Sequence, residues 1–114
     1  MRVALACAAA ALLSGCGGDL CDDQIVSRIP SPNGLYDAIY SIHDCGATTR
    51  RAVWIRIVEH DAAPDSAEPI ATFEGELSAL PEWTGRTLHV HYGHAKPVVM
   101  QATFETAKIE YSAD

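Results

Sequence analysis

The stretch RAVWIRIVE, residues 51–59, alternates two sets of side chains with a period of two. Because successive side chains of an extended chain point to opposite sides, three β-branched residues share one face: Val53, Ile55 and Ile57. Trp54 and Arg56 point to the opposite face. The pattern predicts a β-strand with a clear inner face. Its outer tryptophan is either covered by a second layer or binds a partner.

The residues before this stretch predict a β-hairpin. Ser31-Pro32-Asn33-Gly34 has serine, proline and glycine at the first, second and fourth positions, which suits a type I turn, and glycine is free to take a positive φ. The turn separates the run Gln24 to Ile29 from the run Leu35 to Ile42. Alternate residues of the second run share one face: Tyr36, Ala38, Tyr40 and Ile42. We expect these runs to form two antiparallel strands.

Short runs of the same kind continue after residue 59. The strands that we expect there are Ile70 to Glu74, Arg86 to Tyr92, Val98 to Phe104 and Lys108 to Tyr111. Residues 81–85 around Trp83 predict a turn, and residues 60–69, with two prolines and three acids, predict a polar connector without the regular spacing of a calcium loop. The sequence therefore predicts an all-β fold, a small antiparallel β-sandwich or curled sheet of about six to seven strands in one domain over residues 24–114.

The first residues, MRVALACAAAALLSGCGGDL, predict an export signal. One basic residue, Arg2, precedes an apolar run that is too short for the ~20 residues that span a bilayer. Leu13-Ser14-Gly15-Cys16 resembles the lipobox of bacterial lipoproteins. The resemblance implies removal of residues 1–15, a diacylglycerol on Cys16 and a tether over residues 16–23. The alternative is an ordinary secretory signal that leaves Cys16 as a plain thiol.

The lipobox resemblance also implies a location. A lipid anchor holds a protein to a membrane that the chain does not cross. Gly17, directly after the anchor, resembles the sorting position of lipoproteins in Gram-negative bacteria and implies the outer membrane, with the domain facing the periplasm. The membrane is then a partner through the lipid alone.

Two cysteines remain in the exported part of the chain, Cys21 and Cys45. Export leads to an oxidising compartment, where two remaining thiols pair. Closing the loop between them would stabilise the fold by roughly 3.5 kcal/mol in the chain-entropy model. The alternative is a nucleophilic Cys45, because His43 lies two residues earlier on the same face of a strand and could act as its base.

The charge of the chain argues against a nucleic-acid partner. Loss of Arg2 with the signal leaves 7 basic residues against 15 acidic ones, so the formal charge moves from −7 to −8. A domain of this charge repels nucleic acid and anionic membrane surfaces. We therefore expect no nucleic-acid partner. Since the export signal predicts an envelope location, the expected partner is an envelope protein or glycan that the sequence does not identify.

The stretch SPNGLYDAIYSIHDCGATT, residues 31–49, resembles a motif of short, uncharacterised, exported bacterial proteins. That motif reads approximately SPDGKY, then a strand, then CGATT. The resemblance extends over about residues 31–57 and departs from the motif at Asn33 and Leu35. It implies an exported protein and brings no known reaction.

Three histidines in HVHYGH, residues 89–94, are candidate metal ligands. His89 and His91 share one face of a strand, and His94 follows in the turn, so the three could hold zinc or copper. The alternative is a polar outer face of an antiparallel strand.

A second candidate site is the basic spot after Cys45, where loop amides and guanidinium groups could hold an anion or contact a partner. Its residues are Thr48, Thr49, Arg50 and Arg51. The alternative is a solvated entrance to the next strand, with the arginines pairing with nearby acids such as Asp44.

No catalytic motif of the GxSxG, HExxH or C-x-x-C type occurs in the sequence. We therefore expect no catalytic residues and no resident cofactor. The predicted function is that of a lipid-anchored envelope protein with a binding or structural role, and the alternative is a periplasmic protein that binds metal through His89, His91 and His94.

Overall fold

The computed structural model describes residues 21–46 and 51–114. The signal peptide, the lipidation site Cys16 and most of the tether lie outside the described residues, and so do Thr48, Thr49 and Arg50 of the predicted anion site. Within the described part of the chain, no helix is long and apolar enough to cross a membrane.

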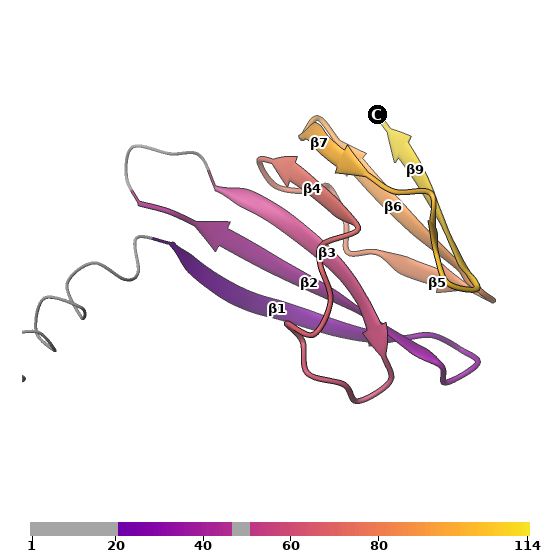
Figure 1. The fold of residues 1–114 in the computed structure, drawn as a ribbon. Helices are drawn as coiled ribbons and strands as arrows, with labels where there is room; N and C mark the ends of the chain where they lie inside the picture. The colour runs from indigo at the N-terminus through magenta and orange to yellow at the C-terminus, as the bar shows by residue number, and fades with distance from the viewer. Residues whose placement is uncertain (1–20, 47–50) are drawn as a thin grey trace, which may run out of the picture.

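The described residues form nine strands and no helix, so the predicted all-β fold is confirmed (Figure 1). The strands are β1 (Asp22–Pro30), β2 (Tyr36–Asp44), β3 (Ala52–Glu59), β4 (Ala71–Glu74), β5 (Glu82–Thr84), β6 (Thr87–Gly93), β7 (Lys96–Met100), β8 (Thr103–Phe104) and β9 (Ala107–Ala113). They make a five-stranded sheet of order β1-β2-β3-β4-β7 and a four-stranded sheet of order β5-β6-β9-β8.

The strand count and one pairing differ from the expectation. The run Val98 to Phe104 is split between β7 in the first sheet and β8 in the second, and β5 forms where a turn was expected. β6 and β9 pair in parallel, whereas all other pairs are antiparallel. The parallel pair follows from the chain path, because between β6 and β9 the chain crosses to the first sheet, adds β7 there and returns.

The predicted hairpin between β1 and β2 is confirmed. The amide of Gly34 donates a hydrogen bond to the carbonyl of Ser31 at 3.0 Å, and Gly34 has a φ of 75°. The side chain of Asn33 supports the turn by accepting the amide of Leu35 at 3.1 Å. β1 begins at Asp22, two residues before the expected start, because Asp22 pairs with Asp44 at the open end of the ladder.

The core lies between the two sheets. The alternating residues of β2 and β3 predicted to share inner faces contribute to it: Tyr36, Ala38, Tyr40, Val53, Ile55 and Ile57, with Ile42 packed against its edge. Phe73 of β4 is fully buried, and its ring lies 5.4 Å from that of Tyr92 in the second sheet. The indole of Trp83 donates a hydrogen bond to the carbonyl of Ile29 at 2.9 Å, which links the sheets.

The opposite face of the first sheet is also covered. Residues 60–69, predicted to be a polar connector, contact this face through two arginines. Arg28 donates to the carbonyl of Ala62 at 2.7 Å, and Arg56 donates to the carbonyl of Ala67 at 3.2 Å. We call residues 60–69 the strap. The strap is a second layer over the outer face of the first sheet, which was one of the two alternatives for the outer face of β3. Trp54 itself is half-buried and stacks on His43.

Candidate functional site

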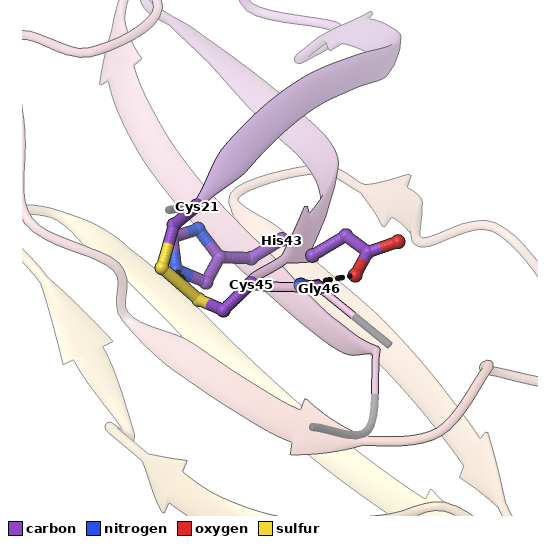
Figure 2. Close-up of a disulfide and its surroundings, with 5 residues drawn as sticks. Cys21, His43, Cys45 and Gly46 are labelled. Carbon is purple, nitrogen blue, oxygen red and sulfur yellow. Dashed lines mark hydrogen bonds between the residues drawn. A yellow bond between two sulfur atoms is a disulfide. The ribbon is translucent and has the colours of Figure 1, made fainter. Parts of the chain in front are cut away.

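The two cysteines predicted to pair lie together at the open end of the β1–β2 ladder (Figure 2). Cys21 immediately precedes β1 and Cys45 immediately follows β2. Their sulfur atoms are 2.03 Å apart, at disulfide distance. The hairpin register brings them together, because Asp22 and Asp44 are the last partners of the ladder.

His43 lies against this pair, as its i,i+2 relation to Cys45 predicted. Its Nε2 is 3.3 Å from the sulfur of Cys45 (Figure 2). Its ring stacks on Trp54 with centroids 4.0 Å apart and an interplanar angle of 12°. Its Nδ1 is buried and has no hydrogen-bond partner among the described residues. A sulfur held in a disulfide is not a nucleophile, so this site can do thiol chemistry only after reduction.

The sequence did not reveal a second polar centre around Asp37 on β2. Asp37 is 1% exposed. Its carboxylate accepts hydrogen bonds from Arg28 Nε at 2.6 Å, from His60 Nδ1 at 2.8 Å and from the amide of Asp61 at 3.0 Å. The period of two places Asp37 on the outer face, which a sequence pattern treats as solvated. Only the tertiary position of the strap buries it.

The pKa values of this centre follow from its contacts. Burial acts to raise the pKa of Asp37, but hydrogen bonds from His60, the Asp61 amide and Arg28 outweigh burial and lower that pKa. The hydrogen bond to Asp37, together with its charge, raises the pKa of His60. Both shifts favour a charged pair. The centre therefore ties β1, β2 and the start of the strap together with charged hydrogen bonds.

The predicted histidine cluster is divided between two carboxylates. His91 Nε2 lies 2.6 Å from Asp114 Oδ1, and His94 Nε2 lies 3.6 Å from Asp114 Oδ2. His89 Nδ1 instead faces Glu110 at 3.5 Å. His89 and His91 lie on β6 two residues apart, as expected, and the metal site stays a prediction. The sequence pattern missed Asp114, which comes beside the histidines only through the pairing of β6 with β9.

Arg51 is the one residue of the predicted anion site that the structure describes. Its guanidinium Nε lies 3.6 Å from Asp44, and its Nη1 lies 3.9 Å from Glu76. These partners correspond to the alternative of a solvated strand entrance. Anion binding by the whole set stays a prediction.

An exposed apolar edge is the third feature that the sequence did not reveal. β7 ends the five-stranded sheet, and all five of its residues are exposed. Val98, Val99 and Met100 are 60%, 40% and 46% exposed. Pro97 is the sequence feature that could have indicated an edge. A proline has no N–H to donate to a neighbouring strand, so within sheets it is confined to edge strands, strand starts or bulges.

Comparison with known proteins gives no relative for this arrangement. No family model, no curated protein and no solved structure gives a significant match to the chain.

Proposed function

We propose that this chain is a lipid-anchored protein of the bacterial envelope that binds an extended segment of another envelope protein. The observation that carries the proposal is the apolar edge strand β7, with three consecutive exposed apolar residues. Monomeric proteins usually protect edge strands with charges, prolines, bulges or covering loops, and an accessible edge is a template for strand addition. β7 has such protection at Lys96, at Pro97 and at the register shift beside Val98, so an added strand would pair along the apolar part after Pro97. The backbone groups of β7 after Pro97, which itself has no N–H, would supply hydrogen bonds, and Val98 and Met100 would supply apolar contacts.

The polar clusters of the domain support a binding role over catalysis. The buried acid Asp37 holds Arg28, His60 and the strap, and the buried guanidinium of Arg56 bonds Ser41 and Ala67. These groups are used for structure. A lipid on Cys16 would hold the domain at a membrane surface, where a partner segment is met at high local concentration.

A photoreactive amino acid at Val98 tests the binding surface in intact cells. Lys108 provides the matched control, because it is exposed on β9, which lies between two other strands. We expect an adduct with an envelope protein from position 98 and none from position 108. The absence of an adduct at 98, or equal adducts at both positions, would contradict the proposed surface.

The anchor is tested separately. Cys16→Ser removes the lipid acceptor, so the variant should move from the membrane fraction to the soluble periplasmic fraction. Unchanged membrane fractionation would contradict lipid anchoring and leave the test of β7 unaffected.

A second candidate function is metal binding by the histidines of β6. The observation in its favour is Asp114, whose carboxylate faces both His91 and His94. Two imidazoles and a carboxylate are a common ligand set for zinc. Calorimetric titration of the protein with zinc or copper should then release heat at micromolar metal, and His91→Ala should abolish it. No heat from the wild type would end this candidate.

A further inference from the structure

Three metal-ligating side chains meet at the open end of the β1–β2 ladder. One ligand atom from each of Cys21, His43 and Cys45 lies within 4.8 Å of the others. Figure 2 shows the imidazole lying against the two sulfur atoms. We propose that these residues form a redox-gated metal site, which binds one Zn²⁺ when the disulfide is reduced. The inference is independent of β7 and of the histidines of β6.

The distances of the cluster are close to those of a zinc site. A tetrahedral ion with one thiolate and one imidazole ligand places sulfur and nitrogen about 3.5 Å apart, given their bond lengths to zinc. Cys45 Sγ and His43 Nε2 are already 3.3 Å apart. The two sulfurs must separate to about 3.8 Å for the same geometry. Both cysteines lie outside the strands, so this separation breaks no ladder pair.

The surroundings of His43 present its Nε2 to the sulfurs. Stacking on Trp54 fixes the plane of the ring, and the sulfur of Cys45 is its one polar contact among the residues that the structure describes. His91, for comparison, has a partner at both ring nitrogens, Ser112 at Nδ1 and Asp114 at Nε2. Among the described residues, His43 Nδ1 has no hydrogen-bond partner and Nε2 faces only the sulfur of Cys45, so Nε2 is the nitrogen available to a metal ion between the sulfurs.

The described residues contain a second group of possible metal ligands, which differs from the first in having a cationic side chain beside it. Asp37, His60 and Asp61 also bring three ligand atoms within 4.8 Å. There, the guanidinium of Arg28 lies 2.6 Å from the carboxylate of Asp37 and already supplies the positive charge. No cationic side chain contacts the Cys21–Cys45 pair in the described chain, and thiolate with imidazole is the softer ligand set that zinc prefers.

The gating step is a thiol–disulfide exchange with a dithiol reductant. A thiolate of the reductant attacks the sulfur of the exposed Cys21, the Sγ–Sγ bond breaks, and Cys45 leaves beside His43. The second thiol of the reductant resolves the mixed disulfide, so the reductant is oxidised by two electrons and the protein gains two thiols. Zinc then displaces both thiol protons to solvent and binds two thiolates, His43 and a water molecule.

Zinc titration of the full chain tests the proposal, with Cys7→Ser and Cys16→Ser so that only two cysteines remain. We expect the reduced protein to bind one Zn²⁺ per chain and the oxidised protein to bind none at this site. Co²⁺ in place of zinc should give thiolate-to-metal charge-transfer absorption only in the reduced protein. His43→Ala should weaken zinc binding at least about tenfold, since loss of a group that only hydrogen-bonds to a metal ligand already lowers the affinity by about this factor. His91→Ala is the matched control and should leave binding unchanged.

Three results would overturn the proposal. They are equal zinc affinity of the oxidised and reduced proteins, equal affinity of reduced wild type and His43→Ala, and no zinc binding by the reduced protein. If reduction unfolds the chain, zinc should restore its β-sheet circular dichroism, and failure to do so counts against the site. If His43→Ala does not fold, His43→Gln replaces it under the same expectation. Loss of binding in His91→Ala alone would assign the zinc to β6 instead.

Discussion

Two histidines next to the first sheet, His43 on β2 and His60 at the start of the strap, lie beside very different partners. His60 donates to the buried carboxylate of Asp37, which also accepts hydrogen bonds from Arg28 and from the amide after His60. Every member of that centre has a partner of complementary charge or polarity. His43 contacts one sulfur of a disulfide, and its other nitrogen is buried and has no hydrogen-bond partner within residues 21–46 and 51–114.

The difference in hydrogen bonding indicates different roles for the two sites, stability for the Asp37 centre and reactivity for the His43 site. A fully satisfied polar network strengthens itself in a low-dielectric environment and fixes the elements that it joins. An unsatisfied polar atom costs free energy and persists where the surroundings impose it. The Asp37 centre therefore holds the fold together, whereas the His43 site combines a structural cross-link with an imidazole that structure alone does not require. The predictions below test this assignment.

The largest expected effect comes from the cross-link beside His43. Cys21→Ser with Cys45→Ser frees the loop between them, so the free energy of unfolding should fall by roughly 3.5 kcal/mol in the chain-entropy model. Urea denaturation of the oxidised wild type and of the double variant measures the change. A loss below about 1 kcal/mol would mean that the loop is already ordered in the unfolded chain, and the loop-closure argument would be wrong.

Removal of the buried acid comes next. Asp37→Ala leaves Arg28 and the Asp61 amide without their acceptor, and we expect a loss of about 3 kcal/mol in the free energy of unfolding. This is the lower end of the range for breaking a buried pair, because the side chain of Arg28 is 31% exposed.

Asp65→Ala is the matched control for that substitution. Asp65 lies in the same strap and is exposed, so its loss should stay within about 0.5 kcal/mol. Similar losses for the two variants in urea denaturation would show that Asp37 does not hold the strap.

His43→Ala should affect stability far less than Asp37→Ala. The substitution removes an aromatic stack on Trp54, worth about 0.5–1.5 kcal/mol, and also removes the unpaired Nδ1, which offsets part of that loss. We expect a net change below about 1 kcal/mol in the oxidised protein. A loss as large as that of Asp37→Ala in the same urea measurement would refute the contrast between the two sites.

The smallest expected effect is the pH dependence of the Asp37–His60 pair. The lowered pKa of Asp37 contributes stability above its ordinary value of 3.8, which is lost as the pH falls through the folded value. The raised pKa of His60 contributes stability below its ordinary value of 6.5, which is lost as the pH rises through the folded value. Stability from this pair should therefore be greatest between pH 3.8 and pH 6.5.

His60→Ala isolates the alkaline half of this dependence. The urea midpoint of the wild type should fall as the pH rises above 6.5, and the midpoint of the variant should fall less over the same range. The effect is small because the side chain of His60 is 46% exposed and solvent screens its charge. Identical slopes for the two proteins would show that His60 does not titrate against Asp37.

The parts of the fold that the sequence predicted are the local ones. The period of two in β2 and β3 identified their inner faces, and Ser31 to Gly34 identified the turn. The pairing of Cys21 with Cys45 was predicted from export and the cysteine count, and in the structure the register of this one hairpin brings the two residues together. Each of these depends on neighbouring residues or on a single turn.

The parts that were missed depend on contacts between distant segments. Asp37 looks solvated until the strap covers it, and Asp114 reaches His91 only through the parallel pairing of β6 and β9. The run from Val98 to Phe104 was predicted as one strand, yet the chain leaves one sheet for the other within it. The alternation of apolar and polar residues does not show where the chain passes from one sheet to the other.

The position of β9 sets the order in which the domain can be completed. β1 to β4 can assemble from neighbouring hairpins, whereas β9 must insert between β6 and β8 after the chain has visited the first sheet. Pairings between sequence-distant strands form slowly. Until β9 arrives, its core residues Ala107 and Ile109 are missing from between the sheets, so part of the apolar side of the first sheet stays open to solvent and a nascent chain is prone to aggregate just before its final strand docks.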